Sequence, residues 1–142
     1  MNIYTSYFAN LKKIAQANIM TIAICLYKPK WYNGLSYGVL APTKQILSLK
    51  EDIISYTEQY NRYLGTLNPH KIVEDLNALS QGKDIALLCY EKPSDFCHRH
   101  LVSKWLCDNG YEVSEYTFNF DKYEKRNFYH KATVEELIEH FK

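Results

Sequence analysis

The chain has 142 residues, of which 23% are charged, and its formal net charge is +1 at pH 7. This length predicts one domain over residues 1–142. The near-neutral charge argues against partners that are bound through net charge alone. The four cysteines include no Cys-x-x-Cys pair. With no signal peptide or membrane-spanning run in sight, we expect a cytoplasmic protein with reduced thiols and no membrane contact.

Hydrophobic periodicity predicts alternating strands and helices in the first half of the chain. Residues 2–7 favour a strand, residues 9–17 have the apolar spacing of a helix, and residues 19–27 form an apolar run typical of a buried strand. The following loop, from residue 28 to residue 42, is rich in glycine and proline. A loop of this length in a compact domain is usually functional.

The second half continues the alternation. Two helices are predicted over residues 50–64 and 69–79, and the short apolar run Ile85 to Leu88 predicts a strand that is buried on both faces. Helical spacing returns from Leu101 to the Asn109-Gly110 pair.

Two further elements complete the pattern. Residues 111–118 alternate apolar and polar side chains and predict a strand near the sheet edge, and Thr133 with Glu136 forms a capping-box pattern that opens a last helix. Alternating strands and helices predict an α/β fold: a single three-layer domain with a mainly parallel β-sheet flanked by helices.

The strand at Ile85 to Leu88 runs directly into a group of chemically reactive side chains, and a helix follows them. The group contains Cys89, Glu91, Cys97, His98 and Arg99. Ligands of open α/β sheets bind beyond the carboxyl ends of the strands, and a helix N-terminus favours an anion. We therefore expect the functional site here.

Two side chains of this group have both a functional and a structural interpretation. Arg99 has the planar fork that binds phosphate or carboxylate, or it forms a surface salt bridge with Asp95, Glu91 or Glu115. Cys97, at the first turn of a helix and beside cations, is expected to have a lowered thiol pKa, which suits a nucleophile. Its structural alternative is a small packing residue.

Proton transfer is assigned to Glu91 or His98. Glu91 ends the central strand and suits a general acid or base if it is partly desolvated, or it is a solvated partner of Lys92. His98 is preferred to His100, because residues two apart on a helix point to different faces.

A metal site and a phosphatase loop are the rival hypotheses. Cys89, Cys97, His98 and His100 are suitable ligand types, but their spacing is unlike that of a zinc knuckle, so we expect no metal and no cofactor. A tyrosine-phosphatase loop is excluded because Arg99 lies too close to Cys97 and too far from Cys89, and the loop from Tyr90 to Phe96 has no glycine.

Other substrate-binding residues are expected at neighbouring strand ends and in the long loop. Thr5, Ser6 and Tyr7 end the first strand, and in a parallel sheet they share an edge with Cys89. Trp31, which lies between a lysine and a tyrosine, is a stacking platform for a ring or a local packing anchor.

The stretch from Leu87 to Val102 resembles the central motif of the DUF488 family: a strand ending Leu-Leu-Cys, a glutamate two residues later, and Cys-His-Arg at the start of a helix. Residues 3–7 resemble the first strand of that family, and Pro29-Lys30-Trp31 matches the loop of its short members. The chain lacks the Gly-His-Ser sequence of longer relatives, so it resembles the compact branch. The resemblance implies the fold and the position of the site rather than a reaction.

These features predict a small cytoplasmic enzyme that acts on a phosphate-bearing substrate, a nucleotide or a nucleic-acid base at the C-terminal edge of the sheet. Arg99 and the helix N-terminus would hold the anion, and the thiol of Cys97 would be a nucleophile or would shape the site. The alternative is a non-catalytic module that binds a nucleotide, a nucleic acid or an anion. In either case the partner is a small phosphate-bearing ligand or a nucleic acid.

Overall fold

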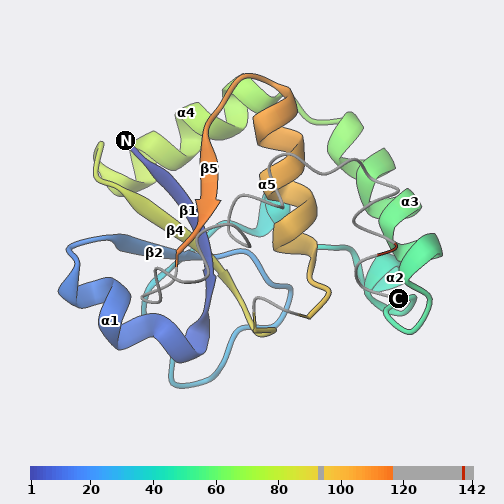
Figure 1. The fold of residues 1–142 in the computed structure, drawn as a ribbon, viewed down its shortest axis with the longest axis horizontal. Helices are drawn as coiled ribbons and strands as arrows, with labels where there is room; N and C mark the ends of the chain where they lie inside the picture. The colour runs from blue at the N-terminus through green and yellow to red at the C-terminus, as the bar shows by residue number, and fades with distance from the viewer. Residues whose placement is uncertain (93–94, 117–138, 140–142) are drawn as a thin grey trace.

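The computed structural model describes residues 1–92, 95–116 and 139. In these residues a parallel sheet has the strand order β3-β2-β4-β1-β5 (Figure 1). The strands are β1 (Ile3–Tyr7), β2 (Met20–Ala23), β3 (Leu35–Ser36), β4 (Ile85–Cys89) and β5 (Val113–Glu115), and the helices are α1 (Leu11–Gln16), α2 (Lys44–Leu47), α3 (Ile53–Gly65), α4 (Pro69–Ser80) and α5 (His98–Asp108). The predicted α/β fold with its parallel sheet is confirmed.

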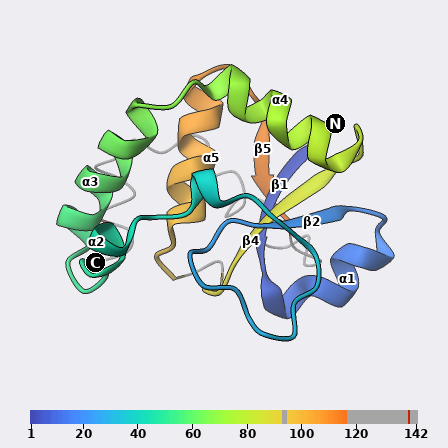
Figure 2. The same cartoon turned by 180° about the vertical axis from the view of Figure 1, so that it is seen from behind.

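The sheet lies between two layers of helices (Figure 1 and Figure 2). On one face the inward side chains of Ile22, Ile85 and Leu87 join a core cluster with residues of α3, α4 and α5. On the other face Ala86 and Leu88 pack in a second cluster with residues of α1. The three-layer arrangement follows from this alternation, since successive side chains of a strand point to opposite faces.

β4 is the interior strand that the sequence predicts. It pairs in parallel with β1 on one side and with β2 on the other, and all five of its residues are buried. Such a strand has no solvent-exposed face, which explains its continuous apolar run. Cys89 lies at the C-terminal end of the strand, as expected, and is its last residue.

Three elements of the first half differ from the prediction. β2 ends at Ala23 rather than at residue 27, because the chain leaves the sheet there and Tyr27 is exposed. The long loop contains β3, and the one-turn helix α2 follows the loop, with its first turn capped by the Thr43 hydroxyl. Elements of two and four residues are too short to show a hydrophobic period.

The helix ends agree better with the sequence. The Asn68 side chain accepts hydrogen bonds from the backbone N–H groups of His70 and Lys71, so it is the predicted N-cap of α4. β5 lies at the sheet edge, as expected. Of the predicted helix after Thr133 the structure describes only Glu139, which is helical. None of the described helices has the length and hydropathy that crossing a bilayer requires.

Candidate functional site

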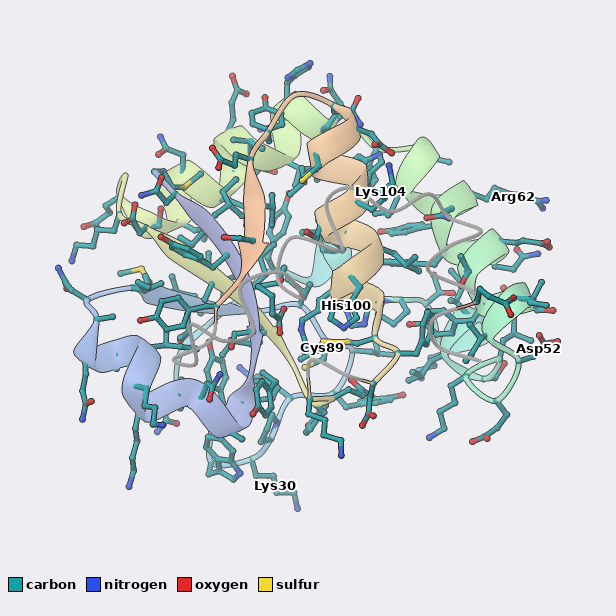
Figure 3. All side chains as sticks on the ribbon, in the orientation of Figure 1. Lys30, Asp52, Arg62, Cys89, His100 and Lys104 are labelled. Atoms are coloured by element: carbon teal, nitrogen blue, oxygen red, sulfur yellow. A yellow bond between two sulfur atoms is a disulfide. The ribbon has the colours of Figure 1, made fainter. Side chains whose placement is uncertain are left out.

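The carboxyl ends of β1, β4 and β5 meet at one edge of the sheet, because the strands are parallel. Tyr7 and Cys89 are paired at the ends of β1 and β4, and Thr5 is paired with Glu115 at the end of β5. The first turn of α5 begins at His98 beside this edge, where Figure 3 labels Cys89. The fold therefore brings together the strand-end and helix-start residues that the sequence selects.

Arg99 forms a buried ion pair with Glu115. Its Nε and Nη2 atoms donate to the two carboxylate oxygens of Glu115 at 3.1 and 2.9 Å, and neither side chain is more than 1% exposed. Its Nη1 atom donates to the Glu91 carbonyl at 2.5 Å and to Sγ of Cys89 at 3.3 Å. The Thr5 hydroxyl donates to the same carboxylate at 2.6 Å. This pair connects α5 to the edge strand.

The contacts of Arg99 bear on both of its predicted roles. The expected alternative was a salt bridge at the surface, and the salt bridge to Glu115 is instead buried. The fork of Arg99, which was expected to hold a substrate anion, holds a carboxylate of the chain itself, and its guanidinium lies 5.8 Å from the centroid of the Tyr7 ring. Anion binding by Arg99 stays a prediction.

A disulfide joins Cys89 to Cys97. The expectation of four reduced thiols is therefore wrong for this pair, because the end of β4 and the residue before α5 lie face to face. Cys25 and Cys107 remain thiols, and burial raises the pKa of both. In the disulfide form Cys97 has no thiolate, so a nucleophilic role requires reduction.

His98 is buried between the disulfide and β2. Its Nε2 atom lies 2.7 Å from the Ile24 carbonyl oxygen, which can only accept, so Nε2 carries the proton. Burial, and then the charge of Arg99, lowers the pKa of His98 to about 4. The neutral ring therefore presents an unprotonated Nδ1 atom, which lies 3.8 Å from Sγ of Cys97.

Other predicted residues have more varied positions. Glu91 is exposed just beyond β4. Thr5 and Ser6 are buried, and the Ser6 hydroxyl donates to the Tyr116 carbonyl at 3.2 Å. These two hydroxyls therefore connect β1 to the edge strand. His100 lies apart from His98, with its Nε2 atom 3.1 Å from the Asp95 carbonyl oxygen.

Two exposed aromatic rings flank Phe8 at the end of β1. The Trp31 ring contacts the edge of Phe8 at a centroid distance of 6.0 Å, and the Tyr90 ring contacts it at 5.1 Å. Trp31 is 60% exposed and Tyr90 is 50% exposed, so both rings keep an accessible surface. We name Trp31, Tyr90 and Phe8 the aromatic group.

Sequence reasoning missed three groups of the site. Glu115 was considered only as a surface partner of Arg99, although it follows Val113 by two residues and so lies on the same, buried face of the strand. The Ile24 carbonyl has no signal in the sequence, because any residue supplies a carbonyl. Tyr90 was not selected, because the sequence does not show whether an aromatic side chain is exposed.

The described residues also form a cavity of about 700 Å³ at the opposite end of the sheet, where the strands begin. It lies where β1 and β5 begin and beside α4, with Asn2, Tyr4, His70, Glu74 and Glu112 among its lining residues. The Nδ1 atom of His70 and the Tyr111 hydroxyl lie 2.6 Å apart on its wall. Ligands of parallel sheets bind at the carboxyl ends of strands, so the candidate site stays at the other end of the sheet.

Comparison with known proteins identifies one family. The model of the family DUF488-N3a, described as the active DUF488-N3 subclade, matches residues 10–110. This match covers β2, β4 and α5, and with them the Cys89–Cys97 pair, His98 and Arg99. Neither the curated proteins nor the solved structures contain a match.

Proposed function

The chain belongs to the DUF488-N3a family, and we propose that it is an enzyme that acts on a nucleotide or a nucleic-acid base at the C-terminal edge of its sheet. We propose further that Cys89, Cys97 and His98 are its reactive centre. The description of the subclade as active agrees with a catalytic role, and it names no reaction.

One observation carries the proposal: an imidazole with an unprotonated nitrogen is held against a pair of cysteines. The Nδ1 atom of His98 lies 3.8 Å from Sγ of Cys97, and the carbonyl of Ile24 fixes the orientation of the ring. Arg99 donates to Sγ of Cys89 from the other side. Polar groups with fixed orientations in a buried environment are typical of a catalytic centre rather than of a packing contact.

Glu91 supplies the exposed carboxylate of the proposed centre. It lies two residues beyond Cys89, and its backbone carbonyl is held by Arg99. We propose that bound substrate covers this carboxylate, and that the carboxylate then acts as a general acid or base.

The aromatic group supports a base or nucleotide as the substrate. Trp31 and Tyr90 present exposed rings, and stacking of a nucleobase on such rings stabilises binding by about 1–3 kcal/mol per base. The exposed lysines Lys28, Lys30 and Lys92 lie within two residues of these rings or of Tyr27 in sequence. Because Glu115 occupies the Arg99 fork, we assign phosphate binding to these lysines first.

The working form of the enzyme in this proposal has reduced cysteines. We place the protein in the cytoplasm, where glutathione and thioredoxin systems keep thiols reduced. The disulfide is then the oxidised form of the same centre, which these systems reduce.

The proposal is tested by conversion of a substrate panel. Reduced protein is incubated with nucleosides, the common nucleoside monophosphates and a short single-stranded DNA, and mass spectrometry follows any change in base or phosphate mass. We expect product from the wild type, and a loss of at least about a hundredfold in rate with Cys97→Ser or Glu91→Gln.

Glu58→Gln is the matched control, because Glu58 is an exposed carboxylate on α3, away from the site. Its rate should equal that of the wild type. Binding of a panel member without any conversion would instead support the non-catalytic module. Equal rates for Cys97→Ser and the wild type would overturn the assignment of the centre.

A further inference from the structure

Three soft or borderline donor atoms converge at the site. The Sγ atoms of Cys89 and Cys97 and one ring nitrogen of His98 all lie within 4.8 Å of one another, and all three residues are buried. The sequence spacing of these three residues is unlike that of a Cys-x-x-Cys zinc knuckle. Here the ligands come instead from the end of a strand and the start of a helix.

The His98 ring is oriented as a metal ligand is. Histidines that bind a metal almost always donate their other ring N–H to a carbonyl or a carboxylate, which fixes the tautomer. The Nε2 atom of His98 donates to the Ile24 carbonyl at 2.7 Å, so Nδ1 faces Sγ of Cys97 at 3.8 Å. Zinc–sulfur and zinc–nitrogen bonds of about 2.3 and 2.0 Å in a tetrahedral site place such atoms roughly 3.5 Å apart.

The backbone separation of the two cysteines also suits a bridging ion once the disulfide is reduced. Their Cα atoms lie 7.5 Å apart. The usual separation in disulfides is about 4.4–6.8 Å, so this pair is more widely spaced than a disulfide needs. A metal ion that bridges two thiolates makes a longer link than a direct sulfur–sulfur bond.

The charges around the cluster suit a divalent cation. Among the described residues, Arg99 supplies the only guanidinium in contact with the cluster, and the carboxylate of Glu115 neutralises its charge. The Nη1 atom of Arg99 donates to Sγ of Cys89 at 3.3 Å, which is a hydrogen bond that a coordinated thiolate accepts. Two thiolates would balance the two charges of the ion.

We propose that the reduced cluster binds one thiophilic divalent cation of the zinc type through Cys89, Cys97 and His98. Reduction by an external dithiol transfers two electrons and two protons to the disulfide, and the dithiol becomes a disulfide. Both thiols then release their protons when the ion binds. Two cysteines and one histidine leave a fourth position for water or substrate, which is the donor set of a catalytic zinc site.

This inference names the cofactor of the proposed centre and so rests on the proposed function for its role. Metal binding itself is measured without substrate. The full-length protein is reduced with a phosphine under anaerobic conditions, freed of the reductant and titrated with Co²⁺. We expect one Co²⁺ per chain, with thiolate charge-transfer bands and the intense visible bands of a tetrahedral site, and their loss when Zn²⁺ is added.

The comparison uses four samples whose fold is checked by circular dichroism. Cys97→Ser and His98→Gln should each lose at least about tenfold in Co²⁺ affinity. The double variant Cys25→Ser/Cys107→Ser retains the three ligands and should give the wild-type spectrum. Oxidised wild type should bind no Co²⁺. Because this sample carries no substitution, the comparison holds even where a variant fails to fold.

Each outcome decides the inference. Absence of the charge-transfer bands from reduced wild type, or equal Co²⁺ affinity of wild type and Cys97→Ser, would overturn the metal site. Substrate conversion by protein that has been freed of metal would then leave the proposed function standing with thiols alone. Metal binding without conversion of any substrate would leave the metal site standing and remove the proposed activity.

Discussion

Arg99 is the largest side chain in the described structure that is fully buried, and its environment explains how a charge is tolerated there. Both oxygens of Glu115, a backbone carbonyl and a sulfur accept its hydrogen bonds. A buried ion pair stabilises little relative to apolar residues, but removing one partner leaves an uncompensated charge. The pair therefore determines how α5 is positioned on the edge strand.

Replacing Arg99 by Met should lower the free energy of unfolding by about 3–5 kcal/mol, because Glu115 is left buried without its partner. Chemical denaturation measures the change. Arg62→Met, on the exposed surface of α3, is the control and should change stability by less than about 0.5 kcal/mol. The double variant Arg99→Met/Glu115→Leu should lose less than the sum of the single losses. Equal losses for Arg99→Met and Arg62→Met would contradict the buried pair.

The cysteines give a second prediction at this scale. The chain has four cysteines, of which two form the Cys89–Cys97 disulfide. Protein treated with a mild disulfide oxidant and then unfolded without reductant should show two reactive thiols by colorimetric titration, and four after reduction. Peptide mapping should find Cys89 linked to Cys97. A cross-link that includes Cys25 or Cys107 would rule out this geometry.

Among the elements, β4 supports both the core and the site. Its residues face two core clusters in alternation, and its last residue is Cys89. The position of the site therefore depends on the packing of this strand between β1 and β2.

Leu87→Ala should destabilise the protein by about 2–5 kcal/mol, because Leu87 is fully buried at the centre of the sheet and its loss leaves a cavity. Leu79→Ala, a matched substitution on the solvent side of α4 where Leu79 is 38% exposed, should have a much smaller effect. Thermal unfolding of the two variants provides the comparison. A larger loss for Leu79→Ala would place the core elsewhere.

The predictability of the elements follows from their length and from the range of the interactions that form them. β4, α4 and the edge position of β5 could be predicted, since an apolar run, an Asn-Pro cap and an alternating segment are local signals. β3 could not, because a two-residue strand forms only through its pairing with β2. The same limit applies to the site, where Cys89, Cys97 and His98 are close in sequence but the Ile24 carbonyl and Glu115 come from distant strands.

For the whole molecule, the two edges of the sheet have different properties. The edge at the carboxyl ends of the strands contains the buried cysteine pair, His98 and the aromatic group. The other edge contains a cavity of about 700 Å³ with His70, Glu74 and Glu112 on its walls. A large cavity alone favours the second edge, whereas the reactive donors and the rule for parallel sheets favour the first. The central claim is that ligands bind at the first.

Chemical-shift mapping tests this claim most directly. A ¹⁵N-labelled sample of the reduced protein is titrated with the nucleoside monophosphates and with a short single-stranded DNA, and the shifted backbone amides are assigned. We predict that the shifts cluster at Tyr7, Trp31, Tyr90 and the first turn of α5. Shifts that cluster instead at Asn2, His70 and Tyr111 would contradict the account and place the ligand in the cavity at the opposite edge.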